Sequence, residues 1–218
     1  MKHTQYFGGV TTEQTKEFMN GISNAEKNAL YKADEAPLDS ANKLESIGLA
    51  VFYGDLLVGE LNAIETLCHL ILTNEIETCV ISVPSPFNSN ENLDLLLESR
   101  KATKNSVEII NGTPFAKSKV YLTGRILTYD ADSNYIESQY YTVIENSAEK
   151  YMTSQINSYL NKISKVYKSD IVGFGKFAAK NFLTQNQWNN YDWRSNFKNT
   201  FFDVDVNVVV ASGYLLET

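Results

Sequence analysis

A long run of helical periodicity between Thr142 and Lys168 constrains the fold of this chain more than any other feature. Thr142 and Glu145 have the spacing of a capping box, so we expect the helix to begin there. Apolar residues recur at intervals of three and four positions and predict one buried stripe: Ile144, Ala148, Met152, Ile156, Tyr159, Ile163 and Val166. At 1.5 Å per residue the helix would span roughly 40 Å, which makes it the longest element.

Strands are predicted on both sides of this helix along the sequence. Residues 47–61 form two apolar runs about a Gly54-Asp55 turn, the pattern of a β-hairpin. Residues 77–83 are rich in β-branched side chains and end at Pro84, which is typical of a buried strand. Further strands are expected at 93–103, 106–110 and 117–129, with Asn111-Gly112 as turn residues. The middle third is therefore predicted to be antiparallel.

The last strand is predicted at residues 203–210, where DVDVNVVV alternates strictly. Its alternating valines should face inward together: Val204, Val206, Val208 and Val210. Shorter helices are expected after Asn62, where Glu65 is spaced for a capping box, and at 176–183 and 185–197. Strands, a long helix and a returning strand predict an α+β fold. Its mainly antiparallel or mixed sheet would pack against one long helix and several shorter helices.

The N-terminal part is predicted to be separate from this domain. Residues 12–30 are compatible with a helix, and residues 33–43, which contain Pro37, resemble a connector. We therefore expect an entry helix and connector over residues 1–44 and an α+β domain over residues 45–218.

Composition excludes several classes of function. The chain has 218 residues, 43% of them hydrophobic, and a formal net charge of −7. This charge argues against a nucleic-acid partner, whose phosphates require clustered Lys and Arg. The sequence contains no apolar run long enough to span a membrane and no signal-like N-terminus, so the chain as given is expected to be soluble.

The sequence GFG at residues 173–175 raises the question of a phosphate-binding loop. It follows a helix rather than a strand, and it lacks both a third glycine and a Lys-Ser/Thr pair. We therefore interpret Gly173 and Gly175 as residues with unusual backbone angles at a corner between helices. Phe174 and Ile171 would fill the core, and Asp170 would cap the next turn.

No residue is assigned a catalytic, cofactor-binding or metal-binding role, and no cofactor is expected. Cys68, His69 and Cys79 lack the repeated spacing of a zinc site. Adjacent helical residues point about 100° apart, so Cys68 and His69 are unsuited to act as nucleophile and base, and we expect core packing instead. A hydrolase using either residue is the least favoured hypothesis, and the chain is predicted not to be an enzyme.

Two segments match the first positions of a calcium-binding loop, but neither has the residues that the later positions require. They are Asp130-x-Asp132-x-Asn134 and Asp203-x-Asp205-x-Asn207. The EF-hand pattern requires Gly at the sixth position and Glu at the twelfth, which neither segment has. A solvated turn and a solvated strand face are therefore favoured.

Trp188 and Trp193 leave two interpretations open. They could form a platform for a carbohydrate or a protein partner, or they could seal the edge of a core, which is the favoured interpretation. The first would fit an extracytoplasmic module that binds a small ligand through residues 188–202.

Taken in order, several of these segments resemble the Ger(x)C family of spore germination proteins. They are GLAVFYGDLLVGELNAIET at 48–66, SDIVGFG at 169–175, Trp188, Trp193 and VDVNVVV at 204–210. Each is weak alone, but their order and separation make the match fairly specific. The resemblance covers most of the chain from about residue 45 onward and corresponds to the C-terminal domain of such a protein.

This resemblance implies the C subunit of a nutrient germinant receptor without enzymatic activity. Such a subunit is a lipoprotein at the outer face of the spore inner membrane, beside integral-membrane A-type and B-type partner subunits. The resemblance implies that a lipidated N-terminal part, absent from this chain, attaches it to the membrane. Neither Cys68 nor Cys79 lies in a context suited to lipidation. A nutrient ligand is conceivable, but no residue is assigned to it.

Overall fold

Gly54 joins two short strands in the first part of the chain that the structure describes. In the computed structural model these strands are β1 (Leu49–Tyr53) and β2 (Leu56–Leu61), and they pair antiparallel. Gly54 has φ +65°, a conformation that suits glycine in a tight turn. The predicted hairpin is therefore confirmed.

The structure describes residues 48–88, 91–127 and 140–211. The chain divides into two compact units, Met1–Asn62 and Ala63–Thr218, and the β1–β2 hairpin belongs to the first. The predicted helix at 12–30 and the predicted connector at 33–43 lie outside the described residues. The division into domains at residues 44 and 45 stays a prediction.

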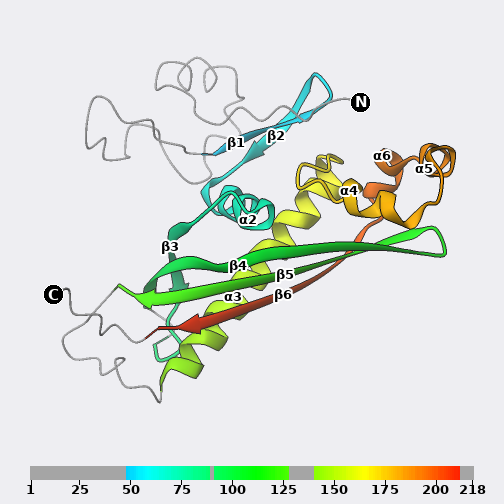
Figure 1. Ribbon diagram of the computed structural model, residues 1–218. Helices are drawn as coiled ribbons and strands as arrows, with labels where there is room; N and C mark the ends of the chain where they lie inside the picture. Colours follow the sequence, from blue (N-terminus) through cyan, green and yellow to red (C-terminus); the bar gives the residue numbers. More distant parts are fainter. Residues whose placement is uncertain (1–47, 89–90, 128–139, 212–218) are drawn as a thin grey trace. The chain divides into compact units, whose positions relative to one another are not determined.

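Four strands form the main sheet of the second unit, in the order β3-β4-β5-β6 (Figure 1). Their bounds are Thr78–Pro84 for β3, Asn92–Ile110 for β4, Thr113–Ile126 for β5 and Phe201–Val210 for β6. The first three strands are antiparallel, and β6 pairs parallel with β5. The predicted α+β fold with a mixed sheet is confirmed.

The β4–β5 hairpin corrects two predicted boundaries. The predicted strands at 93–103 and 106–110 form one strand, β4, whose pairing is irregular between Ser99 and Lys104. This irregular stretch is held from outside the sheet, because Thr103 N–H donates to Asn74 Oδ1 over 2.6 Å. Strand β5 begins at Thr113 rather than at residue 117, since Asn111 and Gly112 both have positive φ and allow a two-residue turn.

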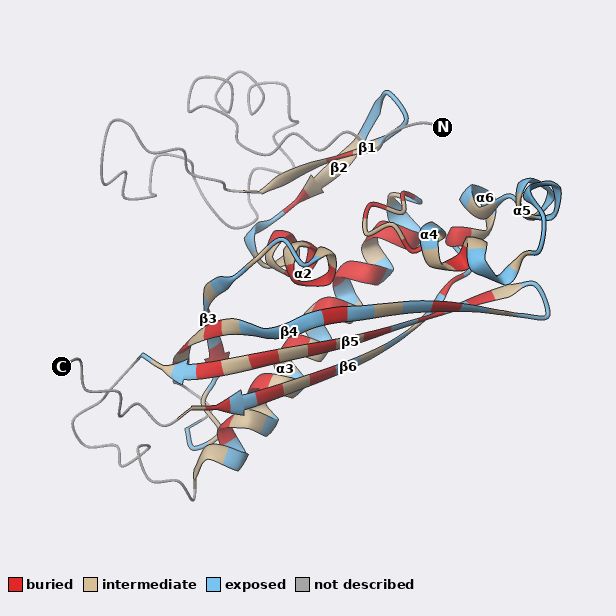
Figure 2. Cartoon of the chain, viewed as in Figure 1, coloured by how far each residue is buried: buried red, intermediate tan, exposed pale blue. Residues whose placement is uncertain are grey.

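Helices α2 (Ala63–Thr73) and α3 (Tyr141–Asn161) pack on one face of the sheet. Buried and exposed residues accordingly alternate along β5 and β6 (Figure 2). Val206, Val208 and Val210 are buried and Val204 is half-buried, as the alternation of the sequence predicts.

Both ends of the long helix differ from the prediction. Tyr140 is its N-cap and no side chain caps it, so the predicted capping box of Thr142 and Glu145 is wrong. At the other end the chain continues as a π-helical segment, η2 (Lys162–Val166). The wider π turn moves Val166 off the buried stripe, where 68% of it is exposed, whereas the other six predicted stripe residues are buried.

Four short helical segments follow the glycine corner. They are α4 (Gly175–Ala178), the 3₁₀ turn η3 (Ala179–Asn181), α5 (Gln185–Tyr191) and α6 (Trp193–Phe197). The single helix predicted at 185–197 is therefore two. They are separated by Asp192, which has φ +48° and whose side chain accepts a hydrogen bond from Ser195 N–H at the start of α6.

Candidate functional site

The corner at residues 170–175 is organised around the carboxylate of Asp170. Asp170 Oδ1 accepts hydrogen bonds from the backbone N–H groups of Gly173 and Phe174, each over 2.9 Å. Oδ2 accepts from Gly175 N–H over 2.6 Å and from the indole Nε1–H of Trp193 over 2.9 Å. The side chain thus caps the turn that opens α4 and also reaches α6.

Asp170 is half-buried, and N–H donors surround its carboxyl group. Burial raises the pKa of its carboxyl above the ordinary value, and the four N–H donors act in the opposite direction because they favour the carboxylate. All four polar contacts are donors. These four donors therefore meet the hydrogen-bonding needs of the Asp170 carboxylate. A phosphate at the same place would compete with this carboxylate for the backbone N–H groups of residues 173–175.

The two glycines of the corner are needed for different reasons. Gly173 has φ +84°, the unusual backbone angle predicted for it. Gly175 has an ordinary φ, so that part of the prediction is wrong. A Cβ on Gly175 would lie 2.8 Å from Trp193 Nε1 and 3.3 Å from Asp170 Oδ2. Only a residue without a side chain therefore fits at this position. Phe174 and Ile171 are buried, as predicted.

Trp193 also belongs to a group of five aromatic rings within residues 182–197, and this group continues through Phe197 to Phe202 on β6. The five rings are those of Phe182, Trp188, Tyr191, Trp193 and Phe197. Neighbouring ring centroids lie 5.0 to 6.4 Å apart, within the range of favourable aromatic contacts. Phe197 is buried and the other four rings are half-buried. Tyr191 OH donates to Gly112 O at the β4–β5 turn over 2.9 Å. The rings pack on one another and against the corner, as expected of residues that seal the edge of a core.

Cys68 and His69 lie side by side on α2 and are both buried. Burial, with a smaller contribution from Glu65, raises the pKa of the Cys68 thiol to about 12. Burial lowers the pKa of His69 to about 4, and its Nδ1 lies 2.8 Å from Tyr159 OH. A protonated thiol and an imidazole bound to a tyrosine provide no thiolate nucleophile at neutral pH.

The remaining candidates from the sequence do not form a site. Cys79 is half-buried, and both cysteines are free thiols. Asp203 lies on the exposed side of β6 and forms an ion pair with Lys117 over 2.5 Å. The segment 130–134 lies outside the described residues. Within the described ranges no three His, Cys, Asp or Glu side chains are placed to hold a metal ion.

Several polar contacts join distant elements and are not predicted by any pattern in the sequence. Glu145 and Glu149 on α3 accept hydrogen bonds from the backbone of β6, and Lys162 forms a 2.8 Å ion pair with Glu65 on α2. The partners in these contacts are 58 or more residues apart in the sequence. Spacing along the chain therefore carried no sign of them.

Comparison with known proteins gives one family and one related structure. The family model for the C-terminal region of spore germination B3/GerAC-like proteins matches residues 47–213. The solved structure titled "Crystal Structure of the GerBC protein" is similar with a TM-score of 0.63 and 23% identity, a likeness that shows the fold alone. The match covers 77% of this chain and 52% of that one, so the chain spans about half the length of that protein.

No curated protein matches the chain. None of the described helices is long and apolar enough to cross a membrane. The family model covers well over half of the chain and includes both the β1–β2 hairpin and the glycine corner. The chain therefore belongs to the family of spore germination B3/GerAC-like proteins and carries the C-terminal region of that family.

Proposed function

We propose that this chain is a domain of the C subunit of a nutrient germinant receptor and takes part in spore germination by binding the receptor's other subunits. The observation that carries the proposal is the family match over residues 47–213. The expected partners are the integral-membrane A-type and B-type subunits. We expect the full-length subunit to lie at the outer face of the spore inner membrane. Its N-terminal part would carry the lipid that attaches it to the membrane.

The chemistry of the described side chains supports a binding role rather than a catalytic one. Asp170 is surrounded by N–H donors that hold the chain in place. Cys68 and His69 are buried, and burial shifts the pKa of each away from the range that nucleophilic catalysis requires. We assign none of these three residues a chemical step.

Co-isolation from a membrane extract tests this role. The full-length C subunit that contains this chain is tagged, expressed with its cognate A-type and B-type subunits, and isolated in mild detergent. We expect both membrane subunits to be recovered with it, and recovery to fall when residues 47–213 are deleted. Unchanged recovery after this deletion would contradict the proposal for this domain.

The second candidate function is binding of a small ligand by the aromatic cluster. The observation in its favour is that four of the five rings are only half-buried. The ring centroids of Trp188 and Trp193 lie 6.1 Å apart, with their planes inclined by 28°. Tryptophan fluorescence titrated with amino acids, sugars and nucleosides tests it. A saturable change that disappears in Trp188→Leu would favour ligand binding, and no change with any nutrient would leave partner binding as the better proposal.

A further inference from the structure

The charge of this chain is distributed unevenly along the sequence. The chain has 19 basic and 26 acidic residues, and residues 162–198 hold seven of the basic and two of the acidic ones, a formal charge of +5. The rest of the chain holds 12 basic and 24 acidic residues, a formal charge of −12. One segment of an acidic chain is therefore strongly basic.

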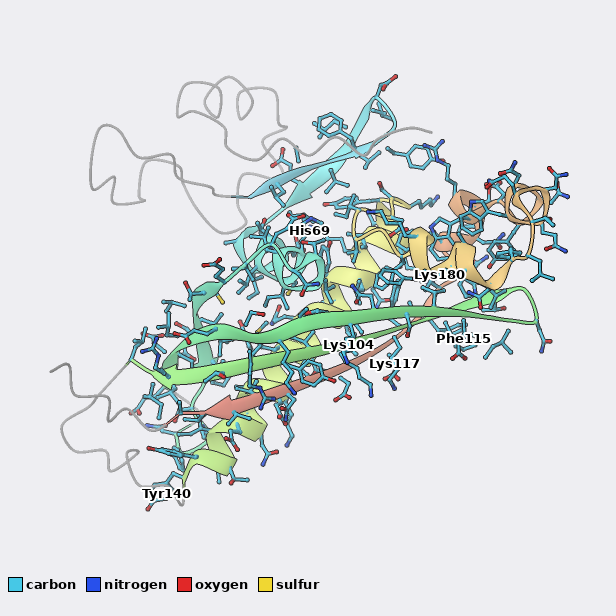
Figure 3. All side chains as sticks on the ribbon, viewed as in Figure 1. His69, Lys104, Phe115, Lys117, Tyr140 and Lys180 are labelled. Atoms are coloured by element: carbon cyan, nitrogen blue, oxygen red, sulfur yellow. The ribbon has the colours of Figure 1, made fainter. Side chains whose placement is uncertain are left out.

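The residues of this segment come together at one end of the second unit. The segment contains η2, the glycine corner and the short helical segments that follow it, and α5 reaches the β4–β5 turn through Tyr191 (Figure 1). Lys165 Nζ donates to the backbone carbonyl of Lys198, so the two ends of the segment are in contact. Figure 3 shows Lys180 among these helical segments, apart from Lys117 on the sheet. We call residues 162–198 the basic end.

Most of the positive charge of the basic end is not neutralised within the part of the chain that the structure describes. Lys162 forms an ion pair with Glu65. The two acidic residues of the basic end, Asp170 and Asp192, accept hydrogen bonds from neutral N–H and O–H groups. Five exposed lysines form no ion pair with any described residue: Lys165, Lys168, Lys176, Lys180 and Lys198.

The neighbouring elements add little negative charge. Residues 150–161 of α3 and the whole of β5 contain no acidic residue. Glu108 on β4 and Asp203 on β6 are exposed on the face of the sheet opposite the helices, and Asp203 is paired with Lys117. At physiological ionic strength, exposed charges more than about 8 Å apart are largely screened from one another. A surface that approaches the basic end would therefore respond to its local positive charge and not to the net charge of the chain.

The basic end also exposes apolar side chains. Leu183, in the connection before α5, is 95% exposed, and Val166 on η2 is 68% exposed. Helix α5 has no buried residue, and it carries the half-buried rings of Trp188 and Tyr191 (Figure 2). Lysines combined with an exposed leucine and amphipathic aromatic rings are typical of surfaces that bind the headgroup region of a bilayer.

We propose that the basic end binds the surface of an anionic lipid bilayer, with its lysine ammonium groups on lipid phosphates and Leu183 among the headgroups. The lysines are spread from η2 to the end of α6. A bilayer offers phosphates to all of them, whereas a folded protein partner would need carboxylates at matching positions. The inference goes beyond the proposed function, because binding to lipid requires no other subunit.

Binding of the purified 218-residue chain to vesicles tests the proposal. Both tryptophans of the chain, Trp188 and Trp193, lie in the basic end, so their fluorescence reports binding at this place. We expect a saturable fluorescence change with vesicles that contain phosphatidylglycerol, and quenching when these vesicles carry brominated lipids. Vesicles of phosphatidylcholine alone should give little change, and equal binding to both kinds of vesicle would overturn the proposal.

Two matched triple variants locate the binding surface. Lys168→Gln, Lys176→Gln, Lys180→Gln removes three charges from the basic end, and at about fivefold per lysine it should weaken binding to phosphatidylglycerol vesicles about a hundredfold. The control removes three exposed lysines elsewhere, has the same net charge and should bind as the wild type does: Lys101→Gln, Lys104→Gln, Lys150→Gln. Equal weakening in the two variants would overturn the proposal, because net charge would then govern binding.

Substitution of Leu183 gives a test that does not depend on the lysines. Leu183 is almost fully exposed, so Leu183→Gln should fold as the wild type does. We expect it to bind the same vesicles at least about threefold more weakly, because less apolar surface enters the headgroup region. Unchanged binding would show that Leu183 does not lie among the headgroups.

The outcomes also separate this inference from the proposed function. If the chain binds vesicles as expected but the full-length subunit does not recover the membrane subunits, the proposed function fails and the inference stands. If the chain does not bind phosphatidylglycerol vesicles, the inference is overturned whatever the co-isolation shows. Loss of the membrane subunits from the first triple variant would then indicate that the basic end binds protein.

Discussion

Individual residues in this protein act mainly by arranging the backbone of distant segments. Asp170 accepts hydrogen bonds from three consecutive backbone N–H groups and from Trp193, which is 23 residues away. Gly175 has no side chain, and this leaves room for the indole that makes the last of these contacts. The glycine corner and the aromatic cluster are therefore parts of one local arrangement.

Substitution of Gly173 tests the backbone role of the corner. At φ +84° a β-branched side chain is strained, so Gly173→Val should lower the free energy of unfolding by roughly 1 to 3 kcal/mol. Asn tolerates positive φ better than Val, so Gly173→Asn should cost less. Urea denaturation measures both. Equal stability of the Val variant and the wild type would show that the corner does not need glycine.

His69 should make stability depend on pH. Burial lowers its pKa in the folded chain to about 4, from an ordinary value of 6.5. The unfolded chain therefore takes up a proton first as the pH falls, and stability should drop between about pH 6.5 and pH 4, by up to about 3 kcal/mol. Urea denaturation at several pH values measures this loss.

The control for the pH dependence is His69→Gln, which cannot take up that proton. The variant is expected to have a lower free energy of unfolding at every pH, because the contact with Tyr159 OH changes. The two proteins are therefore compared by the slope of their free energy of unfolding against pH. The slope between pH 6.5 and pH 4 should be shallower in the variant. The same slope in both proteins would mean that His69 does not titrate as its burial requires.

Among the elements, β6 is the edge strand that the long helix protects. Glu149 Oε1 accepts from Val208 N–H over 3.0 Å, and Glu145 Oε1 accepts from Val210 N–H over 2.8 Å. These N–H groups lie at the edge of the sheet, where exposed backbone donors promote pairing with other chains. The two glutamates are one helical turn apart and therefore match alternate residues of the strand.

Removing these carboxylates should both destabilise the domain and expose the edge. Glu149→Ala should lower the free energy of unfolding by roughly 1 to 3 kcal/mol, since a hydrogen bond to a charged acceptor is lost and a donor is left unpaired. The double variant Glu145→Ala, Glu149→Ala should also self-associate, which sedimentation velocity measures. Thr142→Ala is the control and should change stability by less than about 0.5 kcal/mol, because no side chain caps the helix there.

At the scale of the whole molecule, the second unit is a four-stranded mixed sheet with helices packed on one face. The covered face packs on α2 and α3, and the opposite side of β5 and β6 carries the Phe115–Phe201 stack and the facing pairs Lys117–Asp203 and Lys119–Asp205.

Much of the element order could be predicted from local patterns. The alternating valines predicted β6 and its buried side, and the periodicity of residues 144–163 predicted the buried stripe of α3. Asp170 was correctly predicted to cap the next turn, because the oxygens of an Asp side chain at such a position can accept hydrogen bonds from the first N–H groups of the turn. The order of these segments along the chain also indicates the family.

The sequence by itself determined which segments are helix or strand and which of their sides are apolar, because those properties depend on neighbours within a few positions. Only the tertiary structure decided that Gly175 makes room for Trp193, that Glu145 bonds β6 instead of capping its own helix, and that Lys104 faces Lys119. Each of these depends on how strands pair and how a helix lies across them. Such contacts join residues far apart in the sequence, where spacing along the chain carries no information.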